Sequence, residues 1–139
     1  MGRKAAVTSL SRRAKPCLDW WPDWSDDAAL LVASGYSAQE QPLETARGKV
    51  KTLAINESWR LAPWADALFG VDWDWWNYRK GVPDFPGLKI GQNLRGLGAK
   101  WGIREITLSK KRCEILTDEK GVLGRAHSGF AAINLAVQF

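Results

Sequence analysis

The chain has 139 residues, of which 45% are hydrophobic and 25% are charged, and this composition is ordinary for one globular domain with a buried core. The net charge of +5 resides in residues 1–16, which hold no acid, and from residue 17 onward the charges balance. No stretch reaches the apolar length of a membrane span, and two cysteines without CxxC spacing cannot complete a zinc site with a single histidine.

Two segments are expected, a basic flexible arm over residues 1–17 and a single α/β domain over residues 18–139. The arm can contact nucleic acid or an anionic surface, or it can be a solubilising terminus, and we favour the second interpretation. Because the body of the chain has no excess of basic residues, nucleic-acid binding ranks lowest among the functions considered. Both thiols are expected to be reduced and structural, in a cytoplasmic compartment.

The first ordered elements are a tryptophan-rich lead-in over 18–24 and a strand over 28–33. Three indoles around a proline are expected to pack on the domain edge. Six apolar residues in a row predict a strand that is buried on both faces. A turn of small residues then begins at Ser34, in which Gly35 is expected to take positive φ or to approach a ligand, and Ser37 can cap a following helix or donate to an anion.

Further along, apolar runs predict strands at 50–55 and 67–71, each closed by a polar residue, Asn56 and Asp72 respectively. The other expected elements are short helices at 42–47 and from Trp73, strands at 88–90 and 103–108, a polar surface at 113–120 and a flexible segment at 121–124. A final helix over 128–139, with Ser128 as its N-cap, is apolar nearly all round and is expected to be buried. Because such a helix normally feeds another strand, we expect the domain to be an incomplete fragment.

Three strand ends and one helix start could share a binding site. The carboxyl ends of parallel strands form the ligand-binding edge of an α/β sheet, and a helix N-terminus favours phosphate. Asn56 can recognise a base or ribose, and Asp72 can hold a ribose hydroxyl or a metal ion. The alternative is that Asn and Asp close strands only because their side chains cap turns. The candidate nucleotide-binding residues are Ser34, Gly35, Ser37, Asn56, Asp72, Ser128 and Gly129.

This order of motifs resembles phage and bacterial proteins related to the family 42 sialyltransferases and the motility-accessory-factor proteins. The resemblance rests on short motifs across roughly residues 28–139. They are Ser34-Gly35-Tyr36-Ser37, Ala54-Ile55-Asn56, Phe69-Gly70-Val71-Asp72, His127-Ser128-Gly129, and Arg60 to Asp66, which is similar to the phage members especially.

The resemblance implies a Rossmann-like fold that holds a nucleotide, such as the cytidylyl part of an activated sugar. Two departures from the family's pattern bear on activity. Tyr36 replaces the usual proline of the loop, and the region of the transferases' catalytic histidine has no match, so His127 is not assigned as catalytic.

Two functions follow as hypotheses. The first is a nucleotide-sugar-binding, glycosyltransferase-like domain, for which Asp72 and Asp74 are candidate bases without a distinguishing motif. The second is a non-enzymatic phage structural or binding module that keeps the fold, with Trp73, Trp75 and Trp76 contacting carbohydrate or protein. In both hypotheses no metal or other cofactor is expected apart from the nucleotide or nucleotide-sugar ligand.

Overall fold

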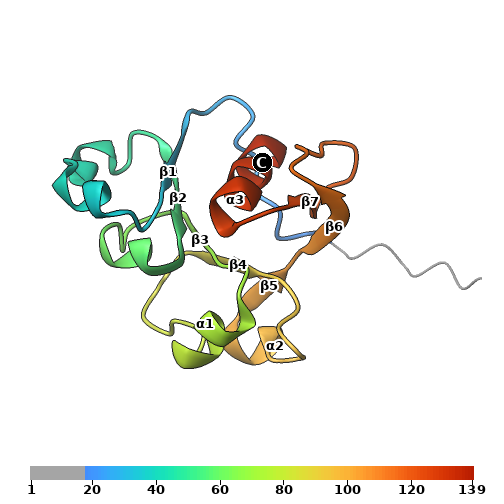
Figure 1. The fold of residues 1–139 in the computed structure, drawn as a ribbon. Helices are drawn as coiled ribbons and strands as arrows, with labels where there is room; N and C mark the ends of the chain where they lie inside the picture. Colours follow the sequence, from blue (N-terminus) through green and yellow to red (C-terminus); the bar gives the residue numbers. More distant parts are fainter. Residues whose placement is uncertain (1–17) are drawn as a thin grey trace, which may run out of the picture.

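A computed structural model describes residues 18–139, and the predicted basic arm over residues 1–17 lies outside them. The centre of the molecule is a five-stranded sheet in which every neighbouring pair of strands is parallel (Figure 1). Its strands follow one another across the sheet in chain order: β1 (Ala29–Val32), β2 (Lys51–Ile55), β3 (Ala67–Phe69), β4 (Leu88–Gly91) and β5 (Ile103–Glu105).

Short helical elements connect the strands. They are the 3₁₀ helices η1 (Tyr36–Glu40), η2 (Leu43–Ala46) and η3 (Asn56–Arg60) and the α-helices α1 (Trp73–Tyr78) and α2 (Gly98–Trp101). The predicted fold class, a Rossmann-like α/β domain with a mainly parallel sheet flanked by helices, is therefore confirmed. The order of the five strands does not reverse within residues 18–139, so these strands alone form no crevice at a change of winding direction.

The central strands bury side chains on both faces of the sheet, since successive residues of a strand point to opposite faces. In β3, Ala67 and Phe69 belong to one apolar cluster and Leu68 belongs to the other. The first cluster includes residues of the C-terminal helix, and the second includes Trp76 of α1 and Phe85 of the loop that follows it. This alternation is why the short apolar runs of the sequence form central strands.

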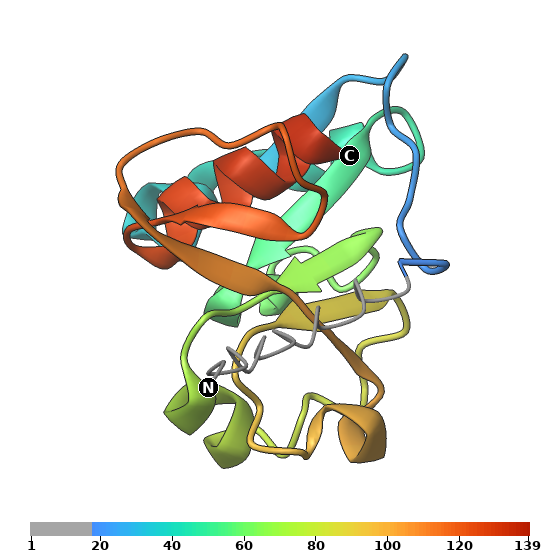
Figure 2. The same cartoon turned by 90° about the vertical axis from the view of Figure 1, so that its right-hand side faces the viewer.

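A second layer covers the face of the sheet that carries Ala67 and Phe69 (Figure 2). It consists of a parallel pair of strands, β6 (Thr107–Arg112) and β7 (Val122–Arg125), and of helix α3 (Ser128–Gln138). The carbonyl of Phe139, just after α3, accepts a hydrogen bond of 2.7 Å from the backbone N–H of Trp24, which precedes β1. The end of α3 therefore lies at the amino edge of the sheet, and its start lies toward the carboxyl edge.

The tryptophan-rich lead-in packs on the domain edge as the sequence predicts. Trp24 is buried, and its ring packs edge-on against the Phe139 ring, with 4.8 Å between the ring centroids. The Trp21 indole makes a similar contact with Phe139 and donates to the carbonyl of Gln138 over 3.3 Å. These contacts fix the chain just before it enters β1.

Several expectations about the strands are wrong. The strand predicted at 28–33 is not buried on both faces, because β1 pairs only with β2 and forms an edge of the sheet, so Ala29 is exposed. The run predicted at 103–108 divides into β5 and β6, which belong to different sheets. The segment at 121–124 is not a flexible loop, since most of it forms β7 against β6.

Two further expectations are corrected by burial. Helix α3 is not buried all round, because Ile133 and Val137 remain 50% and 56% exposed on the side away from the sheet. Cys113 is a free thiol on the surface with no structural role in the core. Within residues 18–139, no helix is long and apolar enough to cross a membrane.

Candidate functional site

The carboxyl edge of the sheet gathers most of the polar residues predicted to bind a ligand. Because the strands are parallel and in register, Ser34 follows β1, Asn56 follows β2 and Asp72 follows β3 along this one edge. Helix α3 begins at Ser128 toward the same edge.

Asn56 has the most specific geometry of these residues. It takes a left-handed backbone conformation with φ of 50°, which Asn tolerates better than most residues. Its side-chain carbonyl oxygen Oδ1 is buried and makes no hydrogen bond within residues 18–139. A buried amide oxygen without a partner carries a free-energy penalty, so this atom is a natural point for a ligand donor or water to bind.

Gly70 and Trp75 form the wall beside Asn56. A Cβ atom at Gly70 would lie 3.1 Å from Asn56 Oδ1 and 3.0 Å from the ring of Trp75. The indole Nε1 of Trp75 donates to Oε1 of Glu57 over 2.8 Å, which fixes the ring over this edge. The absence of a side chain at Gly70 is therefore what allows strand, amide and indole to meet.

Glu57 holds this wall together electrostatically. It accepts hydrogen bonds from Nε of Arg79 at 2.6 Å and from Nε of Arg60 at 3.0 Å, besides the bond from Trp75. Desolvation alone would raise the pKa of Glu57, but the bonds from Arg79 and Trp75 and the attraction of both arginines outweigh it. The result is a pKa below the ordinary value for glutamate, so the carboxylate is charged at neutral pH.

The two candidate bases, Asp72 and Asp74, are both exposed. Asp72 is the N-cap residue of α1, but its side chain makes no capping hydrogen bond. Asp74 lies in the first turn of that helix, where a carboxylate favours the positive end of the helix dipole. Their positions follow from the strand end and helix start, and neither has a geometry that marks it as a general base.

The start of α3 differs from the sequence prediction by one residue. The N-cap is His127, whose Nδ1 accepts a hydrogen bond of 3.3 Å from the backbone N–H of Phe130. Ser128 is the first helical residue, so the prediction that it caps the helix is wrong. Gly129 lies against the His127 ring, and a Cβ atom added to this glycine would lie 3.2 Å from Nδ1.

The small-residue turn after β1 is more open than expected. Gly35 has φ of −65° and nothing within 4 Å of a Cβ placed on it, so it neither takes positive φ nor packs closely. Ser37 lies inside η1, whose N-cap is Gly35, and it makes no capping bond. A pocket of about 290 Å³ lies over this turn, and its lining includes residues 30–33 of the β1 region, Gly35, and Ser37 of η1.

The tryptophans of α1 do not form one exposed surface. Trp76 is completely buried, and its Nε1 donates to the carbonyl of Gly70 over 2.9 Å, so the expectation that it contacts a partner is wrong. Trp73 is partly exposed and stacks on Trp101, with 5.7 Å between the ring centroids. The guanidinium carbon of Arg95 lies 4.9 Å from the centroid of the Trp73 ring. Trp73 and Trp75 therefore remain at the rim of the carboxyl edge, and Trp76 belongs to the core.

Sequence patterns alone do not reveal the residues that organise this edge. Glu57 and Arg79 lie 22 positions apart, and no local pattern pairs them. Gln92, which follows β4, donates from Nε2 to the carbonyl of Val71 at 3.4 Å and extends the polar edge by one strand. A polar residue after each apolar run was the signal that could have identified Gln92.

Comparisons of this chain with protein-family models, with curated proteins and with solved structures found no match. A function for the chain is therefore inferred from its own geometry.

Proposed function

We propose that the carboxyl edge of the sheet binds a nucleotide, which could be the nucleotide part of an activated sugar, in a glycosyltransferase-like domain. The observation that carries the proposal is Asn56 Oδ1, a buried amide oxygen without a partner in the described part of the chain, at the end of a central parallel strand. A base or ribose can donate to this oxygen, and the amide nitrogen of the same side chain can donate in return.

The surroundings of Asn56 suit such a ligand. The Trp75 ring beside it offers an apolar surface on which a base can stack, and its position is fixed by Glu57. The first turn of α3 supplies backbone N–H groups, which favour a phosphate group. Asp72 at the next strand end is exposed and can accept from ribose hydroxyls.

Glycosyl transfer would require more than a nucleotide site. Asp72 and Asp74 are within reach of the edge, but glycosyl transfer also needs a base that is oriented against the acceptor hydroxyl. The alternative is a non-enzymatic binding module of a phage-type protein that keeps this fold. The partly exposed rings of Trp73 and Trp75 would then contact carbohydrate or protein.

Calorimetric titration of the full chain with CMP, UMP and AMP tests the proposal. The variant Asn56→Asp keeps the size of the side chain and its tolerance of left-handed φ, but it replaces the amide donor with a negative charge. Its matched control is Asn77→Asp, the same change at an exposed position of α1. We expect Asn56→Asp to lower nucleotide affinity by about tenfold or more, because the variant cannot donate to the base or ribose and places a negative charge beside the ligand.

Two results would argue against the proposal. One is the absence of heat with every nucleotide from a chain shown to be folded by circular dichroism, which would favour the binding-module alternative. The other is an equal loss of affinity in Asn56→Asp and Asn77→Asp, which would indicate a general effect of added charge. Measurable transfer from a nucleotide sugar would instead direct attention to Asp72→Asn and Asp74→Asn as the next variants.

A further inference from the structure

We infer that a second site, on the flank beside η3 and α1, binds a phosphate dianion. The site is a pocket of about 290 Å³ whose lining includes Arg60, Arg79 and Lys80 as cations and Asp84 as an acid. We call it the η3–α1 pocket. This inference does not depend on nucleotide binding at Asn56, because it concerns different side chains and a different chemical group.

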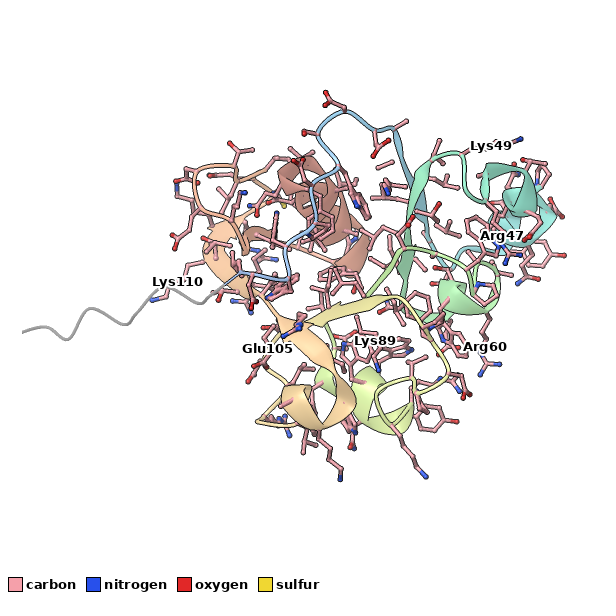
Figure 3. All side chains as sticks on the ribbon, turned by 180° about the vertical axis from the view of Figure 1, so that it is seen from behind. Arg47, Lys49, Arg60, Lys89, Glu105 and Lys110 are labelled. Carbon is pink, nitrogen blue, oxygen red and sulfur yellow. The ribbon has the colours of Figure 1, made fainter. Side chains whose placement is uncertain are left out.

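The two arginines of the pocket are held in place before any ligand arrives. Both donate to the carboxylate of Glu57, and both do so through Nε. This contact leaves the terminal NH₂ groups of each guanidinium directed elsewhere, and Figure 3 shows Arg60 standing out from the ribbon. Arginines fixed in this way lose less side-chain entropy when they bind an anion.

Aromatic rings also restrain the same arginines. The Arg60 guanidinium carbon lies 5.3 Å from the Trp59 ring centroid, and that of Arg79 lies 4.9 Å from the Tyr78 ring. Trp59 and Tyr78 both line the pocket. Each ring restrains the guanidinium group beside it, so both arginines are partly ordered before an anion binds.

Lys80 is positioned by an unusual turn. Lys80, Gly81 and Val82 are consecutive residues with positive φ, at 50°, 72° and 48°. Such a conformation is strained for a β-branched residue such as Val82, and it persists only where the surroundings enforce it. Here the Gly81 carbonyl accepts a hydrogen bond of 2.8 Å from Nζ of Lys89, and Val82 is buried.

The chemistry of the pocket selects a compact anion. Glu57 neutralises part of the arginine charge, and when it is counted with Asp84 the three cations still exceed the two acids. Two guanidinium groups and an ammonium group, one from η3 and two from the turn that ends α1, match the tetrahedral oxygens of a phosphate better than a planar carboxylate. The phosphate could be free inorganic phosphate or the phosphoryl group of a nucleotide.

Titration of the full chain with inorganic phosphate, CMP and cytidine, followed by calorimetry, tests the inference. Lys80→Asn removes the cation and keeps a residue that tolerates left-handed φ. Its matched control is Arg95→Asn, which also removes a cation at an exposed residue with φ of 51°, outside the pocket. We expect phosphate affinity to fall by about tenfold in Lys80→Asn and to stay unchanged in Arg95→Asn.

The arms of the experiment separate the possible outcomes. If Lys80→Asn weakens phosphate and CMP together, the pocket holds the phosphoryl group of the nucleotide, and if it weakens phosphate alone, the ligand is free phosphate. Cytidine, which has no phosphate, should respond only to Asn56→Asp, so the two sites fail independently. The inference is overturned if folded wild-type protein binds no phosphate, or if Arg95→Asn loses as much phosphate affinity as Lys80→Asn.

Discussion

Asn56 and Gly70 close two neighbouring parallel strands at the same level, so near to each other that a Cβ on Gly70 would lie 3.1 Å from Asn56 Oδ1. The amide oxygen is buried there without a hydrogen-bond partner in the described part of the chain. The end of β2 fixes the position of the Asn56 side chain. Gly70, at the end of the neighbouring strand β3, has no side chain and so leaves room for the Asn56 amide.

Gly70→Ala should disturb this contact directly. The added methyl group would meet both Asn56 Oδ1 and the Trp75 ring at about van der Waals contact or closer, so these groups must shift. We expect a loss of unfolding free energy of about 1–2 kcal/mol, measured by urea denaturation, together with weaker nucleotide binding. Gly35→Ala is the control, since its φ of −65° and open surroundings accept a methyl group, and it should stabilise by about 0.5 kcal/mol. Equal effects of the two substitutions would contradict this account of Gly70.

Gly81→Ala should be among the most damaging single methyl additions. Its Cβ would clash with Cβ of Trp101, and its φ of 72° disfavours any side chain. We expect a destabilisation of about 3 kcal/mol from the two effects combined. Gly102→Ala shares the left-handed φ but has open space around it, so it should lose only about 1 kcal/mol. A similar loss in both variants would show that the contact with Trp101 does not matter.

Stability should depend on pH through Glu57. Because the folded-state pKa of Glu57 is lowered, its contribution is fully present above the unfolded-state pKa of about 4.3 and is lost as the pH falls through the folded-state pKa. The difference in unfolding free energy between wild type and Glu57→Gln should therefore shrink as the pH is lowered from about 6 to about 3. Urea denaturation of both proteins across this range measures it. A difference that stays constant with pH would mean that the charge of Glu57 contributes nothing to the fold.

Asn134 is predicted to be essential for the β6–β7 layer. Its side chain is fully buried, accepts from the backbone N–H groups of Leu116 and Gly124, and donates to the Leu116 carbonyl at 2.7 Å. Asn134→Ala would leave the backbone N–H groups of Leu116 and Gly124 without this acceptor, while the Leu116 carbonyl keeps its bond from Nε2 of Gln138, and the variant should cost about 3 kcal/mol in thermal or urea unfolding. Val137→Ala, at a position of α3 that is 56% exposed, should change stability by less than about 0.5 kcal/mol. If Asn134→Ala is equally mild, water replaces the side chain there.

The parts of the fold that follow from local pattern could be predicted from the sequence. The apolar runs before Asn56 and Asp72 predict central parallel strands, since residues buried on both faces leave no other arrangement, and the polar residue after each run marks the carboxyl edge. The same logic was wrong for 28–33, because whether a strand lies at the centre or at the edge depends on its neighbours and not on its own residues.

The remaining features depend on contacts between distant parts of the chain. Strand β7 is Gly-containing and short, and it forms only because β6 pairs with it and Asn134 binds the N–H of Gly124. The three bonds to Glu57 come from residues up to 22 positions away. His127 caps α3 in place of Ser128, a shift of one residue that the identity of the two side chains does not determine.

The most direct test of the nucleotide site is a map of ligand-induced shifts in the ¹⁵N–¹H spectrum of the full chain titrated with CMP. We predict that the side-chain NH₂ of Asn56 and the backbone amides of Asn56, Gly70, Ser128 and Gly129 shift together along a single binding curve. Residues at the amino ends of the strands, such as Lys49 and Lys51, should not move. Shifts that cluster around Lys49 and Lys51 and spare Asn56 would contradict the central claim.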